Sequence, residues 1–248
     1  NPLGGAVEGP TVGERFRSFV GWLPLPTRHG LTPGEVLAFA AAAGFAHNAE
    51  VVPCDGWHRG LWMDEHDAPW VLPSPNMPTL DTAVVYPGMC LLEGTNISEG
   101  RGTTRPFEIF GAPYINAHEL GRVLADLQLP GVAFRACAYV PTFDKFRGQR
   151  CYGLQQHITD REAYRPLLTG AAILWAVARL YPAHFAWRAD AYEFVDDVPA
   201  IDLLFGSELP RGCIERSEPF AALAALLATP ADLNAAVSAA RLTVYNAP

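Results

Sequence analysis

The sequence predicts a mixed fold, α/β or α+β, in a chain large enough for one large domain or two small ones. Half of the 248 residues are hydrophobic and only 18% are charged, a composition that excludes intrinsic disorder. Capped helical segments alternate along the chain with short runs of branched and aromatic residues. This alternation predicts helices and strands mixed throughout.

The two earliest helices are predicted from their caps. Thr32-Pro33-Gly34-Glu35 is a capping box with proline at the first helical position, and it opens an alanine-rich helix that stops at Gly44. Asn116 with Glu119 opens the second helix, which we expect to run to about Gln128 before a Pro-Gly pair breaks it.

Three further helices are expected in the second half of the chain. Thr159 with Glu162 opens a long one, whose apolar run reaches Leu180. Two more are expected near the C-terminus, around 219–228 and 231–241.

Short runs rich in branched or aromatic residues predict strands. They lie at 50–53, 84–92, 132–140 and 154–158. We expect the last three to pack on the long helix. The proline-rich stretch 69–78 is predicted to be a linker or an ordered wall of a cleft, because prolines keep a loop rigid.

Charge and cysteine content exclude several classes of protein. The net charge is −8, and Lys145 is the only lysine, so the chain lacks the basic block that nucleic-acid binding needs. The longest apolar stretch, 166–182, contains Arg179 and predicts a buried helix instead of a membrane span. The five cysteines show no CxxC pair, so they predict neither a zinc site nor a disulfide framework.

The first residues predict that the chain is a fragment or a processed product. It opens Asn1-Pro2-Leu3-Gly4-Gly5, without an initiator methionine and without the pattern of a signal peptide. A Pro-Gly-Gly opening is typical of the middle of a loop.

The densest polar segment, 92–105, is the best candidate for a small-molecule site. We expect it to follow an apolar strand, and it holds three glycines, two carboxylates and two guanidinium groups. Glycines let a backbone approach a ligand closely, and loops after strands often bind small molecules. The alternative is a solvated turn with Glu–Arg pairs on its surface. A phosphate loop is excluded, because the GxxxxGK[ST] pattern is absent.

Other candidate residues stand in turns. Glu8 lies between two turn elements, where a carboxylate can face a cleft or be merely exposed. His29 precedes a glycine and the first capped helix, and could point into a pocket or into the core. Ser98 is a weak nucleophile candidate, since no GxSxG motif occurs.

Several segments carry a pattern that is specific in both order and residue type. They are 1–10, 28–32, and 73–78 leading into 92–104. The run EGTNISEGRGTTRPFE, which begins at Glu93, is too long to arise by chance. Over nearly the whole chain these segments resemble the exo-β-N-acetylmuramidase family, NamZ.

The resemblance implies a domain organisation. The family has an N-terminal Rossmann-like domain and a C-terminal auxiliary domain, with the active site in the cleft between them. Residues 1–77 are then the closing part of the Rossmann-like catalytic domain, and 78–248 the auxiliary α/β domain. The family's preceding segment, with a glycine-flanked Glu-His motif, is not among these residues. One catalytic carboxylate is therefore expected in a missing N-terminal half of the same protein.

The resemblance also implies an activity. Such enzymes remove N-acetylmuramic acid from the non-reducing end of peptidoglycan fragments in cell-wall turnover, and are secreted or periplasmic. Glycosidic cleavage needs two carboxyl groups. Glu8 is the first choice for a catalytic carboxylate, because the family motif surrounds it, and Glu93 and Glu99 are the next.

Substrate-binding roles follow from residue type and position in the motifs. Arg101 is the expected anchor for the lactyl carboxylate of muramic acid, with Arg105 behind it, because a guanidinium grips a carboxylate with two hydrogen bonds. Asn76 and Asn96 are expected to bind the acetamido group and hydroxyls, and His29 to orient a catalytic carboxylate. No cofactor and no metal are expected.

Two alternatives stay open. The first is a peptidoglycan-fragment binding protein that holds muramic acid without cleaving it. The second is a metal-dependent hydrolase that uses His58, His66 and Asp64.

Overall fold

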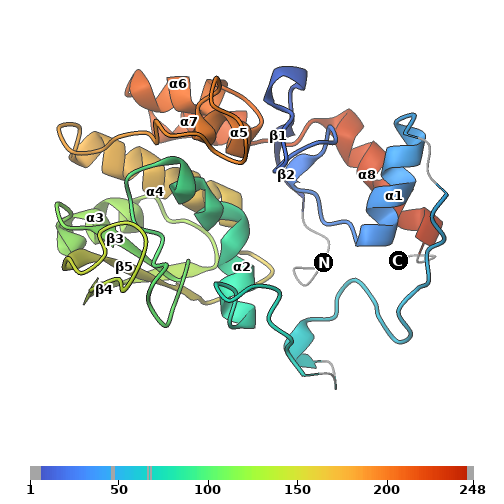
Figure 1. The fold of residues 1–248 in the computed structure, drawn as a ribbon, viewed down its shortest axis with the longest axis horizontal. Helices are drawn as coiled ribbons and strands as arrows, with labels where there is room; N and C mark the ends of the chain where they lie inside the picture. Colours follow the sequence, from blue (N-terminus) through green and yellow to red (C-terminus); the bar gives the residue numbers. More distant parts are fainter. Residues whose placement is uncertain (1–6, 46–47, 66, 68, 245–248) are drawn as a thin grey trace.

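The computed structural model describes residues 7–45, 48–65, 67 and 69–244, and His66 therefore lies outside the described residues. Helices and strands are mixed along the chain, as Figure 1 shows, so the predicted mixed α/β class is confirmed.

The described strands form two small antiparallel sheets. β1 (Glu8–Thr11) pairs with β2 (Pro26–Arg28). The second sheet has the order β3 (Ile109–Ala112), β5 (Cys151–Ile158), β4 (Val132–Tyr139). The strands predicted at 132–140 and 154–158 are thereby confirmed. Because β1 and β2 are antiparallel, the Rossmann-like character of the first part stays a prediction.

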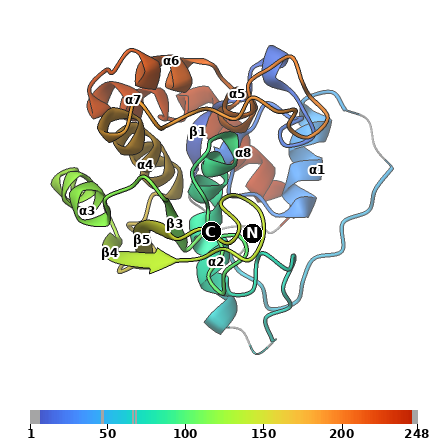
Figure 2. The ribbon, with the colours of Figure 1, turned by 60° about the vertical axis from the view of Figure 1, so that its left-hand side comes forward.

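The larger part of the molecule, residues 80–227, is here called the body. Its central element is α4 (Pro166–Leu180), an apolar helix that is buried along most of its length. Figures 1 and 2 show α4 between the three-stranded sheet with α3 on one side and a group of short helices on the other. The other helices of the body are α2 (Leu80–Met89), α3 (Ala117–Asp126), α5 (Ala200–Phe205), α6 (Leu209–Glu215) and α7 (Phe220–Leu226).

Two glycines set the crossing of α2 and α4. A Cβ atom at Gly88 would overlap the carbonyl of Pro166, and one at Gly170 would overlap the carbonyl of Gly88. The two backbones are therefore in direct contact, and neither position tolerates a side chain.

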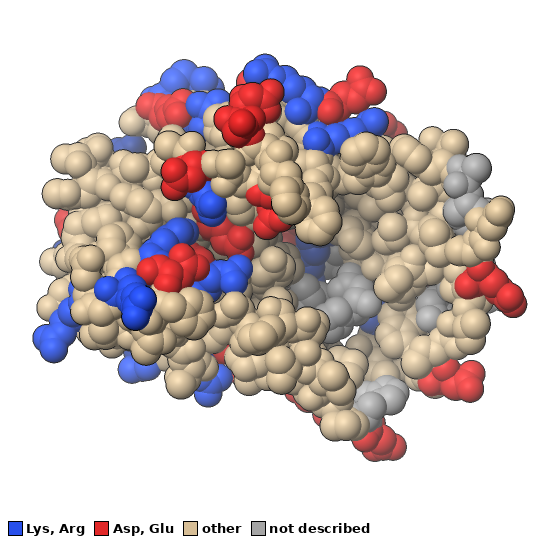
Figure 3. Space-filling view, viewed as in Figure 1, with Lys and Arg blue, Asp and Glu red and all other residues tan. Residues whose placement is uncertain are grey.

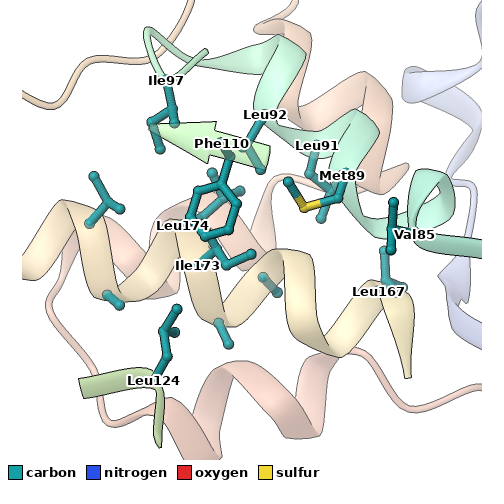
Figure 4. Packing of buried hydrophobic residues seen from close by; sticks show 14 of the residues in the cluster. Val85, Met89, Leu91, Leu92, Ile97, Phe110, Leu124, Leu167, Ile173 and Leu174 are labelled. Atoms are coloured by element: carbon teal, nitrogen blue, oxygen red, sulfur yellow. The ribbon is translucent and has the colours of Figure 1, made fainter. Parts of the chain in front are cut away.

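The core of the body fills the space around this crossing. Figure 4 shows Val85 over Leu167 of α4, and Met89, Leu91 and Leu92 in the same layer of apolar side chains above this helix. Met89, Leu91, Leu92 and Leu167 are fully buried. Since α4 is apolar on nearly all sides, it can be covered by the sheet and by helices at once.

The segment predicted as a strand at 84–92 is helical, so that prediction was wrong. It forms most of α2 and then the 3-10 helix η3 (Cys90–Gly94). Thr79 caps α2 by accepting a hydrogen bond from the backbone of Thr82. The apolar run is buried on several faces against α4, and such a run lacks the amphipathic period that distinguishes a helix from a strand.

The other helix predictions have mixed outcomes. The capping box at Thr32 opens α1 (Pro33–Ala42), and Asn116 caps α3, as expected. The long helix begins at Pro166 and not after Thr159, because the side chain of Asp160 holds the next residues in a turn. Pro166 also disfavours helical geometry for the residue that precedes it, Arg165. The two C-terminal helices are confirmed as α7 and α8 (Ala231–Val244).

A second, smaller packing unit lies beside the body and is here called the α1–α8 part. It consists of β1, β2, α1 and α8, and Figure 1 shows α1 and α8 next to each other. Its core is a small cluster: Leu25, Leu31, Phe39, Leu233, Val237 and Ala240. The C-terminal helix thus packs on the N-terminal residues. The division at 77/78 stays a prediction.

A long connection joins α1 to α2 with little regular structure. Within its described residues only η2 (Met63–Glu65), a 3-10 turn, is regular. The strand predicted at 50–53 is therefore wrong, and the physical reason is that no strand pairs with it among the described residues. Val52 and Val71 are largely exposed in this connection.

In the part of the chain that the structure describes, no single helix has the length and apolarity to cross a membrane. The bent pair Phe220–Leu226 and Ala231–Arg241 together has that length and composition, with an angle of 46° between its helices.

Candidate functional site

The polar segment 92–105 is folded onto the body and is not a solvated turn. Thr95 and Ser98 each accept a backbone hydrogen bond from two residues further on, which forms two tight turns in succession. Ser98 also pairs with Gly111 at the end of β3. Thr95, Ser98 and Glu99 are each only 2% exposed. The segment follows α2 and η3, and not the apolar strand that was expected.

Arg101 lies at the centre of a group of charges, here called the Arg101 cluster. Its Nη2 donates to Glu93 Oε1 at 2.8 Å, and its Nε lies 3.1 Å from Glu99 Oε1. Asp144 is further away, at 3.9 Å. Burial alone would lower the pKa of Arg101, but the hydrogen bond that it donates to Glu93 and the nearby negative charges outweigh this effect and raise the pKa.

Lys145 completes the cluster from the other side of Glu99. Its Nζ lies 2.9 Å from Glu99 Oε2, and it also donates to the carbonyls of Leu92 and Ile97. Glu99 thus has one cation on each carboxylate oxygen, as a buried charge requires. Figure 3 shows basic and acidic side chains next to one another over the body.

Tyr192 binds the second oxygen of Glu93 at 2.9 Å. Burial raises the pKa of Tyr192, so its hydroxyl keeps the proton that it donates to Glu93. Glu93 is therefore held by a guanidinium on one oxygen and by a phenol on the other.

Glu93, Glu99 and Arg101 lie together in this cluster of ion pairs, and Asn96 does not belong to it. The side chain of Asn96 points to another segment, where Nδ2 donates to the carbonyl of His184 at 2.7 Å. Its Oδ1 accepts from the hydroxyl of Tyr114 and from the backbone of Ala186. The expected role of Asn96 in substrate binding stays a prediction.

Glu8 lies at a different place, at the start of β1. It is 8% exposed, and its Oε2 is 3.4 Å from Arg28 Nη1 on the paired strand. The same oxygen accepts from the backbone of Leu167, at the N-terminus of α4. Burial raises the pKa of Glu8, and Arg28 and Leu167 only partly oppose this.

His29 lines a pocket of about 430 Å³ between β2, the start of α1 and Pro87 of α2. Figure 3 shows this face hollowed between the body and the part that holds α1. Nδ1 of His29 accepts from the backbone of Leu31 at 3.0 Å, so the neutral ring carries its proton on Nε2. Burial lowers the pKa of His29, which favours this neutral form.

Asn76 and Arg105 stand apart from the Arg101 cluster. The backbone of Asn76 donates to Ser74 in a turn of the proline-rich stretch. Arg105 is half-exposed and forms an ion pair with Glu108 at 3.1 Å. The structure does not test the substrate-binding roles that were expected for these residues or for Arg101 and His29.

Sequence reasoning missed Lys145, Tyr192 and Glu108. Lys145 had a signal, because it is the only lysine in a chain whose other cations are arginines. Glu108 had one as well, because it is the last residue of the run EGTNISEGRGTTRPFE and lies three residues after Arg105. Tyr192 had none, since its position depends on a contact formed only in the folded chain.

The described residues contain no group of three or more His, Cys, Asp or Glu side chains that could hold a metal ion. Asp64 instead pairs with Arg161 at 2.8 Å. Because His66 lies outside the described residues, the alternative of a metal-dependent hydrolase with His58, His66 and Asp64 is not tested by the structure.

Comparison with known proteins agrees with the motif pattern. The family described as exo-beta-N-acetylmuramidase NamZ matches twice, its C-terminal part at residues 84–233 and its N-terminal part at residues 1–81. The chain belongs to the NamZ family. The resemblance seen in the motifs is confirmed.

Individual relatives of this NamZ-family chain are longer than it is. It is 47% identical over 188 residues to a protein named peptidoglycan beta-N-acetylmuramidase NamZ from Bacillus subtilis (strain 168). The match covers 75% of this chain and 45% of that relative, so the chain spans less than half of the relative's length.

Two solved structures of DUF1343-family proteins from Bacteroides fragilis share the fold. The first superposes with a TM-score of 0.87 at 25% identity, and the match covers all of this chain and 64% of the chain in that structure. The second superposes with a TM-score of 0.70 at 24% identity, and the match covers 97% of this chain and 62% of the chain in that structure.

Proposed function

We propose that this chain is part of a glycoside hydrolase that releases N-acetylmuramic acid from the non-reducing end of peptidoglycan fragments. The observation that carries the proposal is the 47% identity to a relative named peptidoglycan beta-N-acetylmuramidase. Membership of the NamZ family over both parts of the chain supports it. The proposal concerns the activity of the whole protein, because the chain spans only part of that relative.

Glu8 is proposed as the general acid. An acid that protonates the leaving oxygen needs a pKa above that of an ordinary glutamate, and burial shifts the pKa of Glu8 in this direction. Arg28 beside it limits how far the pKa rises and fixes the carboxyl group in place.

Glu93 and Glu99 are proposed as the alternatives to Glu8 for a catalytic carboxylate, since the second carboxyl group of a glycosidase must flank the same bond and the Arg101 cluster lies at a different place from Glu8. Both are held by named donors in the Arg101 cluster, so their positions are fixed before substrate arrives.

Arg101 is proposed to hold the lactyl carboxylate with the part of its guanidinium that is left over. Nη2 and Nε are engaged by Glu93 and Glu99, whereas Nη1 makes no hydrogen bond within the described residues. Because Arg101 also holds the cluster together, the affinity of an Arg101 variant has to be measured for two sugars, muramic acid and N-acetylglucosamine. Selective loss of affinity for muramic acid over N-acetylglucosamine supports the anchor role, and equal loss contradicts it.

Cell location and domain organisation follow from the proposed substrate and family. Because peptidoglycan lies outside the cytoplasmic membrane, we propose that the protein is secreted or periplasmic. We also propose that residues 1–77 belong to a Rossmann-like catalytic domain and 78–248 to an auxiliary domain. No cofactor is proposed, since hydrolysis between two carboxyl groups needs none.

The test is turnover of a chromogenic N-acetylmuramic acid glycoside, followed by identification of the released sugar. It should be run with this chain and with the protein as encoded in its genome. We expect the encoded protein to release N-acetylmuramic acid and to cleave the N-acetylglucosamine glycoside far more slowly. Tight binding of muramic acid by both forms without turnover would contradict the proposal, and would favour a binding protein.

A further inference from the structure

The turn that carries His29 is held by an arginine from a distant part of the chain. This turn, residues 29–31, joins β2 to α1. Arg59 lies in the long connection that follows α1. Its Nη1 donates to the carbonyl of Gly30 at 2.7 Å, and its Nη2 pairs with the carboxylate of Glu35. One guanidinium group therefore ties the turn to the first turn of α1.

The partners of Arg59 are themselves fixed. The side chain of Glu35 is fully buried, so its charge needs the cation that Arg59 supplies. The other oxygen of Glu35 accepts from the backbone of Thr32 at 2.7 Å, as part of the capping box. Gly30 has a φ of 62°, a left-handed conformation that suits glycine. Arg241 of α8 adds a longer hydrogen bond to the carbonyl of Gly30, at 3.3 Å.

The ring of His29 depends on the same turn. Nδ1 accepts from the backbone N–H of Leu31 at 3.0 Å, which leaves the proton of the neutral ring on Nε2. Nε2 makes no hydrogen bond to a described residue and is not one of their fully buried polar atoms without a partner. It is therefore available as a donor at the pocket of about 430 Å³ that His29 lines.

A single peptide unit connects Arg59 to His29. The carbonyl of Gly30 and the N–H of Leu31 belong to the same peptide bond, which is planar and turns as one rigid body. Arg59 holds the carbonyl end of this unit, and Nδ1 of His29 accepts from its N–H end. A rotation that releases Arg59 would therefore also take the N–H away from His29.

The body holds Arg59 from the other side. The guanidinium of Arg59 lies over the ring of Trp57, 5.4 Å from its centre. Three residues after Arg59, Trp62 is buried in the core of the body, where its ring N–H donates to Glu162 at 3.1 Å. The connection is therefore anchored in the body close to the point where it contacts the His29 turn.

We propose that Arg59 is a positioning residue for His29, and that it acts through the peptide unit between Gly30 and Leu31. By holding this unit, it keeps Nδ1 of His29 engaged and Nε2–H available to a group in the pocket. The use of this donor in hydrolysis rests on the proposed function, since the turn directly follows the strand residue that pairs with the proposed acid. The positioning rests on the contacts alone.

The first test measures hydrogen exchange at the amide of Leu31 in the whole protein that the gene encodes. Arg59→Met removes a charge-assisted hydrogen bond, so exchange at Leu31 should become roughly ten- to hundredfold faster. The NMR shifts of the His29 ring nitrogens should change as well, because Nδ1 loses its donor. Unchanged exchange at Leu31, or equal acceleration at Leu31 and throughout α1, would overturn the inference.

Arg161→Met is the matched control. Arg161 also lies over a tryptophan ring of the connection and pairs with a carboxylate there, that of Asp64. Its loss should leave exchange at Leu31 unchanged, and acceleration equal to that in Arg59→Met would contradict the inference. Arg59→Lys keeps the charge beside the buried carboxylate but lacks the planar fork that reaches both acceptors. It should give an intermediate rate, and it serves if Arg59→Met does not fold.

The second test asks whether Arg59 affects the reaction through His29. Arg59→Met should lower kcat roughly ten- to hundredfold, and the double variant with His29→Gln should lose no more than His29→Gln alone. Losses that multiply would show a role independent of His29 and contradict the inference. If the wild-type protein hydrolyses no muramic acid glycoside, the proposed function fails, and exchange at Leu31 still decides the inference.

Discussion

The body and the α1–α8 part are built on different principles. The body surrounds a nearly all-apolar helix with a sheet and further helices, and its large cluster of buried residues includes Phe110 and Leu174. The cluster of buried apolar side chains in the α1–α8 part has six members among the described residues, three of them from the C-terminal helix. The body can be stabilised by its own core, whereas the smaller part depends on contacts to its surroundings.

Those contacts are largely polar. Glu8 accepts from Leu167 at the start of α4, Gly9 donates to Leu227, and Gly13 donates to Gly206. The first of these also satisfies a backbone N–H that the helix cannot satisfy itself, since Arg165 provides no side-chain cap. Glu8, the proposed acid, therefore lies where the two parts meet, whereas the Arg101 cluster lies within the body.

The largest effect should come from emptying a core site in the body. Phe110→Ala should lower the free energy of unfolding by about 3–5 kcal/mol, because its neighbours close only partly around the cavity. Phe39→Ala, in the six-residue cluster, should cost less and change mainly the α1–α8 part. Denaturant unfolding with hydrogen exchange measures both. Equal costs spread over the whole molecule would remove the distinction between the two parts.

The next prediction concerns the helix crossing. Gly170→Ala should cost about 3 kcal/mol, because the added carbon meets the backbone of Gly88 and cannot rotate away. Gly60→Ala, in the exposed connection, meets only His58 at 3.8 Å and should be near neutral. Thermal unfolding of both variants checks this. A tolerated alanine at 170 would show that α2 and α4 are not in contact.

A smaller effect is expected from the Arg101 cluster. Lys145→Met leaves the buried Glu99 with Arg101 as its remaining ion-pair partner, and should cost about 2 kcal/mol. Asp64→Asn breaks a pair whose side chains are 32% and 50% exposed, and should cost at most about 1 kcal/mol. Urea unfolding of both variants gives the two losses of unfolding free energy, and their ratio is the quantity to compare. A ratio near one would mean that the cluster is solvated.

The smallest effect is the pH dependence that Glu8 contributes. Because burial raises the pKa of Glu8 in the folded state, the folded protein binds this proton more tightly than the unfolded chain does. Stability from this group is therefore full below the unfolded pKa and falls as pH rises through the folded pKa. The difference in unfolding free energy between wild type and Glu8→Gln should change with pH in that window. A difference that is flat with pH would contradict the raised pKa.

Local signals in the sequence predicted the elements that depend on local chemistry. The capping box at Thr32 and the cap at Asn116 place α1 and α3, and runs of branched and aromatic residues place β4 and β5. The segment 84–92 failed because its helical state is decided by contact with α4, far along the chain. The strand at 50–53 failed because a strand needs a partner, and sequence pattern alone does not supply one.

The residues of the candidate site likewise divide into those that local sequence predicts and those that only the tertiary fold places. Glu93, Glu99 and Arg101 were found because they are close in sequence and share one folded segment. Lys145 and Tyr192 reach that segment across long separations in the chain, and Asn96 turns away because Tyr114 and the backbone around His184 offer it partners. Such choices depend on the tertiary fold and could not be predicted from the segment alone.

The most direct test measures how the loss of activity in Glu8→Gln depends on the leaving group of the substrate. The variant is made in the whole protein that the gene encodes. A general acid matters for a sugar leaving group, which needs a proton, and little for nitrophenolate, which does not. We expect kcat to fall roughly 10²- to 10⁴-fold on a disaccharide and to change little on the nitrophenyl glycoside. Glu14→Gln, at an exposed glutamate, should alter neither. Equal losses on both substrates would contradict the assignment of Glu8 as the acid.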